Sequence, residues 1–295
     1  MRLEKVVIPA AGLGTRLLTA TKEMPKEMLP IFARGVNGSL VLKPMLQAIF
    51  EQLFDVGFRE FCFIVGRGKR AIEDHFNKDS AFLTTLRSRG KGHLASELED
   101  FYSKVDDSVI VFINQPEPRG FGDAVLRARP FTADDPFLVH AGDDLVLSRD
   151  SSHIRRLISA FSSLEADTAL LMEEVEDPRA YGVVVVEDTT SEGPCRVLDI
   201  IEKPSEPPSN LAAVAIYAFS PVIYDAIRRT KPDRSGEVQL TDAIRLLVAE
   251  GRRVFAVKLR EDEKRIDIGT PERYWRALLE TFTSSAKWAG GGHAG

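Results

Sequence analysis

Along the first half of the chain, short runs of β-branched and aromatic residues alternate with longer segments of helical periodicity. The predicted strands cover residues 6–8, 61–65, 109–113, 137–139 and 168–172. Between them lie helical patterns, among them 43–56 and 152–164. Because strands that alternate with helices build βαβ units, this pattern predicts an α/β fold with a wound, largely parallel sheet.

The second half of the chain has a different character. Strand patterns at 183–187, 196–201 and 213–219 are separated by turns rich in Gly, Pro and Ser, which favours an antiparallel or mixed extension. The remaining predicted elements are helices at 221–229 and 239–250, a strand at 254–259 and a last helix that begins at Thr270-Pro271. We also expect an exposed loop at 33–39, a helical insertion at 79–106 and a disordered tail at 284–295.

Composition limits the class of protein. A chain of 295 residues, 44% of them hydrophobic, can bury a large core as one extended α/β domain or as two smaller ones. The net charge of −5 argues against a nucleic-acid-binding protein, and no apolar run reaches the roughly 18 residues of a membrane span. Cys62 and Cys195 lack metal-type spacing, and no histidines pair at helical spacing. We therefore expect a cytoplasmic protein that uses neither a disulfide framework nor histidine catalysis.

A glycine-containing loop follows the first strand, with the sequence Ala10-Ala11-Gly12-Leu13-Gly14-Thr15-Arg16. Glycines let backbone N–H groups approach an anion and accept the positive φ angles of a tight loop. Arg16, Lys22 and Lys26 add positive charge. The P-loop pattern is absent, and Leu17 stands where the dinucleotide fingerprint needs its third glycine. The loop is predicted to be a phosphate site of another kind, with a plain strand-to-helix turn as the alternative.

Carboxylates follow a predicted central strand in Gly142-Asp143-Asp144. Open α/β sheets bind ligands at the carboxyl ends of their strands, and Mg²⁺ typically uses one or two carboxylates together with substrate phosphates. Asp267, which lies between apolar residues before the last helix, is a second candidate ligand. Their pairing at one Mg²⁺ site is a hypothesis. The alternatives are a solvated turn for Asp143 and a buried hydrogen-bonding role for Asp267.

Three further segments offer polar groups next to predicted strands. Glu202-Lys203-Pro204 supplies an acceptor for sugar hydroxyls beside a positive charge for a phosphate. Gly182 opens a strand where the backbone could approach a ligand, and the segment from Gln115 to Gly122 is a second glycine loop, whose Gln115 amide could meet a base edge. A surface ion pair, a turn and a polar surface loop are the respective alternatives.

Taken together, these segments resemble the sugar nucleotidyltransferase family, and within it the bacterial and archaeal-type UTP–glucose-1-phosphate uridylyltransferases. The resemblance covers almost the whole chain and follows the family's order of blocks. It rests on Gly12-Leu13-Gly14-Thr15-Arg16, Ala20-Thr21-Lys22, Pro25-Lys26-Glu27-Met28-Leu29-Pro30, Ala180-Tyr181-Gly182-Val183, Glu202-Lys203-Pro204, Ser209-Asn210-Leu211-Ala212 and Gln239-Leu240-Thr241-Asp242-Ala243-Ile244. Asp123, where a histidine is common, and a longer loop at 33–42 depart from the family pattern.

The resemblance implies a Rossmann-like three-layer α/β/α nucleotidyltransferase fold. Its central sheet would be mixed and mostly parallel, with a small antiparallel sugar-binding extension. Residues 1–283 would form a single domain, with 1–175 mainly binding the nucleotide and 176–283 mainly binding the sugar phosphate.

The resemblance also assigns roles to residues. The nucleotide-binding residues would be Ala10, Ala11, Gly12, Gly14, Thr15, Arg16, Lys26, Glu27, Gln115, Gly120 and Asp143. The sugar-phosphate-binding residues would be Gly182, Glu202, Lys203 and Val214. Asp143 and Asp267 would bind Mg²⁺, with Asp144 the weaker candidate, and Arg16, Lys26 and Lys203 would be catalytic.

The implied reaction is attack by a phosphate oxygen of glucose 1-phosphate on the α-phosphorus of UTP, which gives UDP-glucose and pyrophosphate without a protein nucleophile. Its substrates are small molecules, and a homodimer or homotetramer is possible. Two other functions stay open: a thymidylyltransferase for the same sugar phosphate, and a non-catalytic nucleotide-sugar-binding protein.

Overall fold

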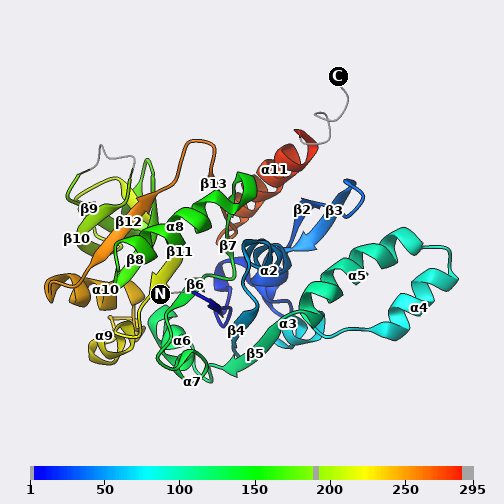
Figure 1. The fold of residues 1–295 in the computed structure, drawn as a ribbon, viewed down its shortest axis with the longest axis horizontal. Coiled ribbons are helices and arrows are strands. Elements are labelled where there is room, and N and C mark those ends of the chain that lie inside the picture. The colour runs from blue at the N-terminus through cyan, green and yellow to red at the C-terminus, as the bar shows by residue number, and fades with distance from the viewer. Residues whose placement is uncertain (1–2, 189–192, 288–295) are drawn as a thin grey trace.

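The computed structural model describes residues 3–188 and 193–287. Within these residues the largest sheet has nine strands in the order β5-β4-β1-β6-β11-β8-β12-β10-β9 (Figure 1). These strands are β1 (Lys5–Pro9), β4 (Glu60–Val65), β5 (Val109–Asn114), β6 (Phe137–His140), β8 (Thr168–Glu174), β9 (Gly182–Val186), β10 (Cys195–Glu202), β11 (Leu211–Phe219) and β12 (Val254–Lys258). Two small sheets are β2 (Pro30–Arg34) with β3 (Leu40–Pro44), and β7 (Asp144–Leu147) with β13 (Lys264–Asp267).

The large sheet is mixed. Strands β5, β4, β1 and β6 are parallel, and so are β8 and β12. Strands β10 and β11 run antiparallel to their neighbours. All remaining strands of this sheet, among the described residues, run in one common direction. The predicted mixed, mostly parallel sheet with an antiparallel extension is therefore confirmed.

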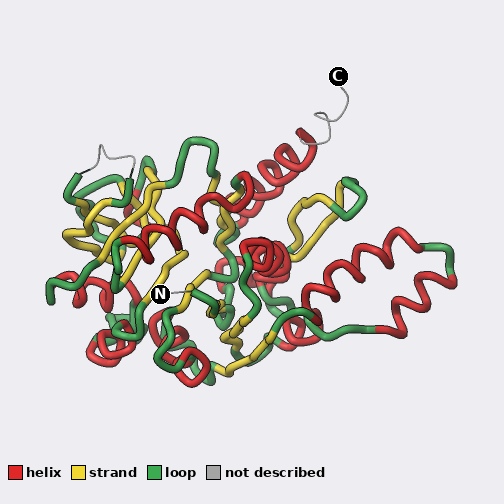
Figure 2. The backbone as a smooth tube through the Cα atoms, viewed as in Figure 1, coloured by secondary structure: helices red, strands yellow, loops and turns green. Residues whose placement is uncertain are grey.

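Helices cover both faces of the sheet (Figures 1 and 2). The helices are α1 (Leu18–Thr21), α2 (Met45–Val56), α3 (Arg70–His75), α4 (Ser80–Ser88), α5 (Gly92–Asp106), α6 (Phe121–Arg127), α7 (Arg129–Thr132), α8 (Ser152–Ser163), α9 (Ile223–Arg229), α10 (Leu240–Ala249) and α11 (Pro271–Lys287). Short 3-10 turns are η1 (Thr15–Leu17), η2 (Lys26–Met28), η3 (Arg149–Ser151) and η4 (Pro178–Ala180).

The alternation of side chains along each strand separates two hydrophobic cores. Val6 and Ile8 of β1 pack with α2, α5 and α8, whereas Val7 packs on the opposite face with α6, α9 and α10. Because successive strand residues point to opposite faces, one buried strand serves both cores. This arrangement is the predicted three-layer α/β/α fold.

Two predicted segments differ from the structure. The first two residues of the expected loop at 33–39 belong to β2, which pairs with β3 in a β-hairpin. Only Gly35 to Ser39 form the turn of this hairpin. The predicted tail at 284–295 is wrong in its first residues, since α11 continues to Lys287. Contacts hold α11 there: the Phe282 ring lies 5.2 Å from that of Phe32, and the backbone N–H of Phe32 donates to Thr281 Oγ1. Residues 288–295 lie outside the described residues.

The insertion at 79–106 is helical as predicted, and forms the α4–α5 hairpin that projects from the body (Figure 1). No helix of residues 3–188 and 193–287 combines the length and the apolar character that a bilayer crossing needs. The parallel strands β1, β4 and β6 all end at one edge of the sheet. The loops that follow them therefore converge there, which is where α/β sheets place their ligands.

Candidate active site

The glycine loop leaves β1 at this edge and turns sharply at Gly14. Gly14 has φ 66°, and a Cβ there would lie 3.2 Å from Thr21 Oγ1, which donates to the Gly14 carbonyl at 2.9 Å. The turn therefore requires glycine. The predicted loop residues from Ala11 to Arg16 line a cavity of about 310 Å³. Ala10 differs, because its side chain is buried in the hydrophobic core.

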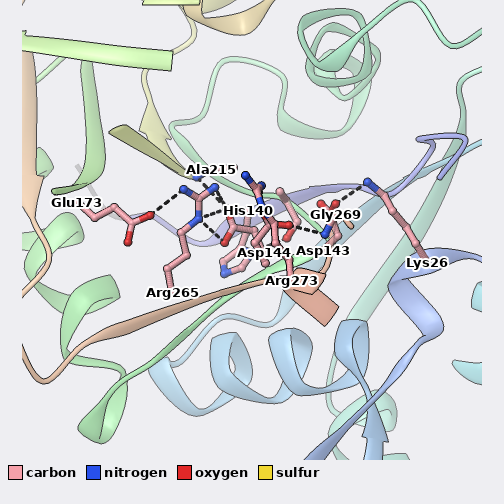
Figure 3. Close-up of polar contacts among 11 residues, drawn as sticks. Lys26, His140, Asp143, Asp144, Glu173, Ala215, Arg265, Gly269 and Arg273 are labelled. Carbon is pink, nitrogen blue, oxygen red and sulfur yellow. Dashed lines mark hydrogen bonds and ion pairs between the residues drawn. The ribbon is translucent and has the colours of Figure 1, made fainter. Parts of the chain in front are cut away.

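Lys26 lies over the loop and is paired with Asp143. Its Nζ is 2.5 Å from Asp143 Oδ2, and a Cβ at Gly12 would lie 3.6 Å from the same Nζ (Figure 3). Burial alone lowers the pKa of Lys26, but Asp143 and Glu27 outweigh burial and raise it. Burial alone raises the pKa of Asp143, and Lys26 with Arg265 lowers it overall. Both groups are therefore charged at neutral pH.

Glu27 lines the same cavity but is paired with a residue that the sequence did not single out. Its Oε2 accepts from Lys69 Nζ at 2.8 Å, and both side chains are almost fully buried. Burial raises the pKa of Glu27, and Lys69 offsets part of that effect. A Cβ at Gly142 would lie 3.2 Å from Glu27 Cγ, so Glu27 packs directly under the loop that carries Asp143. The pair thus links η2, which follows β1, to the loop after β4, and Glu27 packs against the loop after β6.

Gln115 and Gly120 also line this cavity. The Gln115 amide donates to Asp123 Oδ2 at 2.8 Å and to the Gly120 carbonyl at 3.2 Å. Gly120 has φ 96°, and a Cβ there would approach the Val238 backbone to 2.8 Å. Asp123, one of the departures from the family pattern, therefore orients the amide of Gln115.

Antiparallel pairing of β7 with β13 brings the acidic residues together. Asp144 is the register partner of Asp267, and Asp143 precedes Asp144 in the chain. Asp143 and Asp267 both line a second cavity of about 380 Å³. The β7–β13 ladder thus places the two predicted metal ligands at one site, which the sequence alone could not establish.

Asp144 is engaged by Arg265. The guanidinium of Arg265 donates from Nε to Asp144 Oδ1 at 2.8 Å and from Nη1 to Glu173 at 2.9 Å (Figure 3). Burial raises the pKa of Asp144 to about 6, although Arg265 opposes this. Arg265 thus engages both oxygens of Asp144, and Asp144 stays the weaker candidate ligand implied by the resemblance.

Asp267 forms an ion pair with Arg273, and it accepts a hydrogen bond from the backbone N–H of Gly269 at 2.5 Å. Arg16 also reaches this turn, because a Cβ at Gly269 would lie 3.1 Å from Arg16 Nη2. Asp143 and Asp267 thus have hard oxygen donors that cations of this chain neutralise. Such a pair, completed by substrate phosphates, is the donor set that suits Mg²⁺. The described residues contain no group of three or more His, Cys, Asp or Glu arranged as a complete protein cage.

The predicted sugar-phosphate residues Gly182, Glu202 and Lys203 line the second cavity. Glu202 Oε2 accepts from the Thr241 hydroxyl at 2.9 Å, and its Oε1 lies 3.0 Å from Lys203 Nζ. A Cβ at Gly182 would approach Thr241 Cγ2 to 2.7 Å, so glycine is needed there. The Lys203 side chain is 57% exposed, which leaves its ammonium free to reorient toward an anion.

Val214 does not line this cavity with its side chain. It is fully buried in the hydrophobic core, whereas its neighbours Ala213 and Ala215 line the cavity. The alternation of β11 explains the difference, because adjacent residues face opposite sides of the sheet. Only the backbone of Val214 is available for the predicted role.

The two cavities share Arg16, Phe121, Asp143 and Glu237 in their walls. They are therefore compartments of one site, divided at Arg16 and Asp143. One compartment is lined by the glycine loop and the other by Glu202 and Lys203.

Several residues of this site carry little signal in the sequence. Arg265 had a signal, because it stands two residues before Asp267 on one strand, and positions i and i+2 share a face. Arg273, Lys69 and Glu237 had none, since each reaches the site through the tertiary fold. Thr241 lies in a block that supports the family resemblance, but the sequence did not predict its bond to Glu202.

The chain is similar to known proteins along almost its whole length. Residues 5–284 match the family described as nucleotidyl transferase. A UTP–glucose-1-phosphate uridylyltransferase of Bacillus subtilis (strain 168) is 38% identical over 283 residues, which cover 95% of this chain and 91% of the relative.

Solved structures give the same result. A UDP-glucose pyrophosphorylase complexed with UDP-glucose has a TM-score of 0.81 at 30% identity, and the match covers 96% of this chain and 100% of that one. A UTP-bound UGPase from Acinetobacter baumannii has a TM-score of 0.82 at 29% identity, with 95% and 93% covered. The chain therefore belongs to the nucleotidyl transferase family, among its UTP–glucose-1-phosphate uridylyltransferases.

Proposed function

We propose that this chain transfers the uridylyl group of UTP to glucose 1-phosphate and releases pyrophosphate. The observation that carries the proposal is the two-compartment cavity, whose compartments meet at Arg16 and Asp143. A transferase for two phosphorylated substrates needs two adjoining anion sites with a shared centre. The names of the relatives and the UTP and UDP-glucose complexes of similar structures support the choice of substrates.

In this proposal the glycine-loop compartment holds UTP. The backbone from Ala10 to Thr15 approaches the nucleotide, and Gln115 with Gly120 meets the uracil ring. Asp123 supports this role of Gln115, because its bond to the amide nitrogen fixes the amide plane. Arg16 and Lys26 lie at the end of the compartment nearest Asp143, where the triphosphate would cross into the shared wall.

The second compartment holds glucose 1-phosphate. Glu202 accepts hydrogen bonds from sugar hydroxyls, and the Thr241 bond holds its carboxylate in place. Gly182 gives the sugar room beside Glu202, and the exposed ammonium of Lys203 orients the phosphate. This division supports the proposal that residues 1–175 mainly bind the nucleotide and residues 176–283 the sugar phosphate, within one domain.

Asp143 and Asp267 would hold Mg²⁺ in this proposal. When bound, Mg²⁺ supplies charge neutralisation on the phosphates that the two substrates bring together. The carboxylates fit this role because their oxygens are hard donors at the wall of the sugar-phosphate cavity, and Asp143 also lines the glycine-loop cavity. Lys26 has to move from Asp143 toward the triphosphate, so its charge passes from a carboxylate to the leaving pyrophosphate.

The reaction is a direct displacement. A phosphate oxygen of glucose 1-phosphate forms a bond to the α-phosphorus of UTP, and the bond between that phosphorus and the bridging oxygen to the β-phosphorus breaks. Pyrophosphate leaves with the electron pair of the broken bond. Alignment by the two compartments and neutralisation by Arg16, Lys26 and Lys203 supply the catalysis, so the chain needs no nucleophile.

A substrate matrix tests the proposal. UTP, dTTP, ATP and GTP are each incubated with glucose 1-phosphate or galactose 1-phosphate and Mg²⁺, and pyrophosphate is measured. We expect the fastest release with UTP and glucose 1-phosphate. A preference for dTTP would identify a thymidylyltransferase, and binding of both substrates without release in any pairing would identify a non-catalytic binding protein.

We also propose a cytoplasmic homodimer or homotetramer. Trp275, Leu279 and Phe282 are exposed along α11, and Leu40 and Leu42 are exposed on the adjacent β2–β3 hairpin. Figure 1 shows α11 beside this hairpin. The exposed apolar side chains of α11 and of the β2–β3 hairpin support the proposal that a second copy of the chain packs against them. Sedimentation of the wild type and of Leu42→Glu tests this, with a smaller species expected for the variant.

A further inference from the structure

Both carboxylate oxygens of Asp267 accept hydrogen bonds from this chain. Arg273, on the first turns of α11, forms an ion pair with Oδ2, and the backbone N–H of Gly269 donates to Oδ1 at 2.5 Å. The side chains of Asp267 and Arg273 are 20% and 30% exposed, and both line the sugar-phosphate cavity. The guanidinium therefore holds one of the two carboxylate oxygens that a divalent cation would use.

Arg273 has a second contact away from this carboxylate. Its guanidinium carbon lies 5.1 Å from the ring centroid of Tyr181, and that of Arg265 lies 5.0 Å from the same ring. A guanidinium over a tyrosine ring is stabilised by cation–π attraction. Tyr181 also lines the sugar-phosphate cavity, so a guanidinium resting on this ring stays inside the site.

The two arginines at Tyr181 are held differently. Arg265 is bonded to both Asp144 and Glu173, and its side chain is 11% exposed. The one carboxylate that Arg273 contacts, within residues 3–188 and 193–287, is Asp267. Breaking this single pair frees Arg273, whereas Arg265 would have to lose two carboxylates.

We propose that Arg273 is a built-in counter-cation of the metal site: it occupies Asp267 in the absence of a divalent cation and, when one binds, releases the carboxylate while staying over the Tyr181 ring. This inference rests on the proposed function, because it takes Asp267 as a metal ligand. Arg273 is then a positioning residue in two senses: it competes for the carboxylate, and once released it offers its charge to the sugar phosphate.

Competition of this kind lowers the affinity for the cation. A charge-assisted hydrogen bond has to be broken before Asp267 can serve as a ligand, and the net worth of such bonds corresponds to roughly a tenfold factor or more in an equilibrium constant. By linkage, an anion that binds the released guanidinium strengthens cation binding by the same factor by which the cation strengthens anion binding. Through Arg273, binding of the divalent cation and binding of the sugar phosphate would thereby favour each other.

The test is Mn²⁺ binding to the substrate-free protein, measured by electron paramagnetic resonance as the loss of the free-ion signal. We expect Arg273→Gln to bind Mn²⁺ about tenfold more tightly than the wild type. Arg273→Met, which keeps an apolar stem for Tyr181, should show the same gain. Thermal unfolding followed by circular dichroism checks that both variants are folded.

Arg276→Gln is the matched control. Arg276 lies on the same helix, carries the same charge and is exposed to solvent. Its replacement should change the Mn²⁺ dissociation constant less than twofold, on the order expected for a screened surface charge. An equal gain in Arg276→Gln and Arg273→Gln would show a general charge effect and overturn the inference, as would unchanged affinity in both Arg273 variants.

A second readout follows the anion. Glucose 1-phosphate should tighten Mn²⁺ binding in the wild type more than in Arg273→Gln, because the variant has no guanidinium to release. Equal tightening in both would contradict the role of Arg273 toward the sugar phosphate.

Asp267→Asn separates this inference from the proposed function. If the wild type binds Mn²⁺ no better than Asp267→Asn, Asp267 is not a ligand, and the metal assignment and the inference fail together. If binding depends on Asp267 but the Arg273 variants match the wild type, the inference alone fails.

Discussion

Asp144 of β7 and Asp267 of β13 face each other as register partners in a two-stranded ladder outside the large sheet. This pairing brings the segment after β6 and the segment before α11 to one point, where Asp143 and Asp267 line a common cavity. The ladder is short, and buried Arg265 reinforces it by bonding Asp144 from the other strand.

Asp143→Asn should reduce turnover at least about a hundredfold, because it removes the charge of a metal ligand at the wall that both cavities share. The asparagine keeps the shape of the side chain but leaves the Lys26 ammonium without its ion-pair partner, so the melting temperature should fall while the protein stays folded. Steady-state pyrophosphate release and circular dichroism measure the two quantities. A variant with the wild-type rate would remove Asp143 from the metal site.

Lys203→Gln should raise the Michaelis constant for glucose 1-phosphate about tenfold or more and change that for UTP little, because Lys203 lies in the sugar-phosphate compartment. Lys258→Gln is the control, since Lys258 pairs with Glu174 at 3.0 Å and lines neither compartment. Initial rates with each substrate varied give the constants. Equal effects on both substrates would argue against the assigned compartment.

Gly182→Ala should impair the use of glucose 1-phosphate, because the new Cβ would lie 2.7 Å from Thr241 Cγ2 and 3.3 Å from Glu202 Oε2. The double variant Gly182→Ala/Thr241→Ser should recover much of the loss, since serine lacks that methyl group but keeps the hydroxyl that holds Glu202. The ratio kcat/KM for glucose 1-phosphate is measured for the single variants and the double variant. Additive losses would mean that this methyl contact is not the cause.

Lys69→Met should destabilise the protein by about 3–5 kcal/mol, because it leaves the buried Glu27 carboxylate without its partner. Glu27→Leu/Lys69→Met should regain most of this stability, because no buried charge remains. Urea unfolding gives both values. If the double variant is folded but no longer binds UTP, the predicted contact of Glu27 with uridine gains support. If it binds UTP as tightly as the wild type, the Glu27–Lys69 pair has a structural role only.

His140 and His153 make the stability depend on pH. Burial lowers the pKa of His140 to about 4 and that of His153 to about 3. Below about pH 6.5 these histidines bind protons in the unfolded state but stay neutral in the folded state. Their contribution to the free energy of unfolding is therefore fully present above about pH 6.5 and is lost as the pH drops toward 4. His140 alone accounts for a loss on the order of 2–3 kcal/mol by pH 4.

His140→Leu should therefore unfold with a smaller pH dependence between pH 4 and 6.5, measured by urea unfolding at a series of pH values. His93→Leu, at an exposed position on α5, is the control and should keep the wild-type slope. A slope that is the same in all three proteins would mean that His140 is not buried as a neutral group.

The sequence predicted the fold well because the signals were local. Val6, Val7 and Ile8 form a fully buried strand, and the apolar face of 43–56 became α2, shortened at its start because Lys43 and Pro44 belong to β3. The hairpin of β2 and β3 was missed, since Gly35, Asn37 and Gly38 indicate a turn but the flanking residues Leu40 and Leu42 alternate only weakly and face solvent.

The site was predictable where one segment carries its own chemistry, as in the glycine loop and Glu202-Lys203. It was not predictable where a bond depends on the path of the folded backbone. Lys69 reaches Glu27 from 42 residues away, whereas Asp123 and Arg273 reach Gln115 and Asp267 across only 8 and 6 residues, because a helix begins between the partners and sets how they meet. Strand alternation explains why the side chain of Val214 lies in the core. Its neighbours on β11, Ala213 and Ala215, face the cavity, so Val214 faces the opposite side of the sheet.

Transfer of label from [α-³²P]UTP to glucose 1-phosphate tests the central claim most directly. The wild type with Mg²⁺ should convert the label into UDP-glucose and release one pyrophosphate for each labelled product, whereas Asp143→Asn should form almost none. A wild-type protein that binds UTP and glucose 1-phosphate but leaves all of the label in UTP would contradict the account.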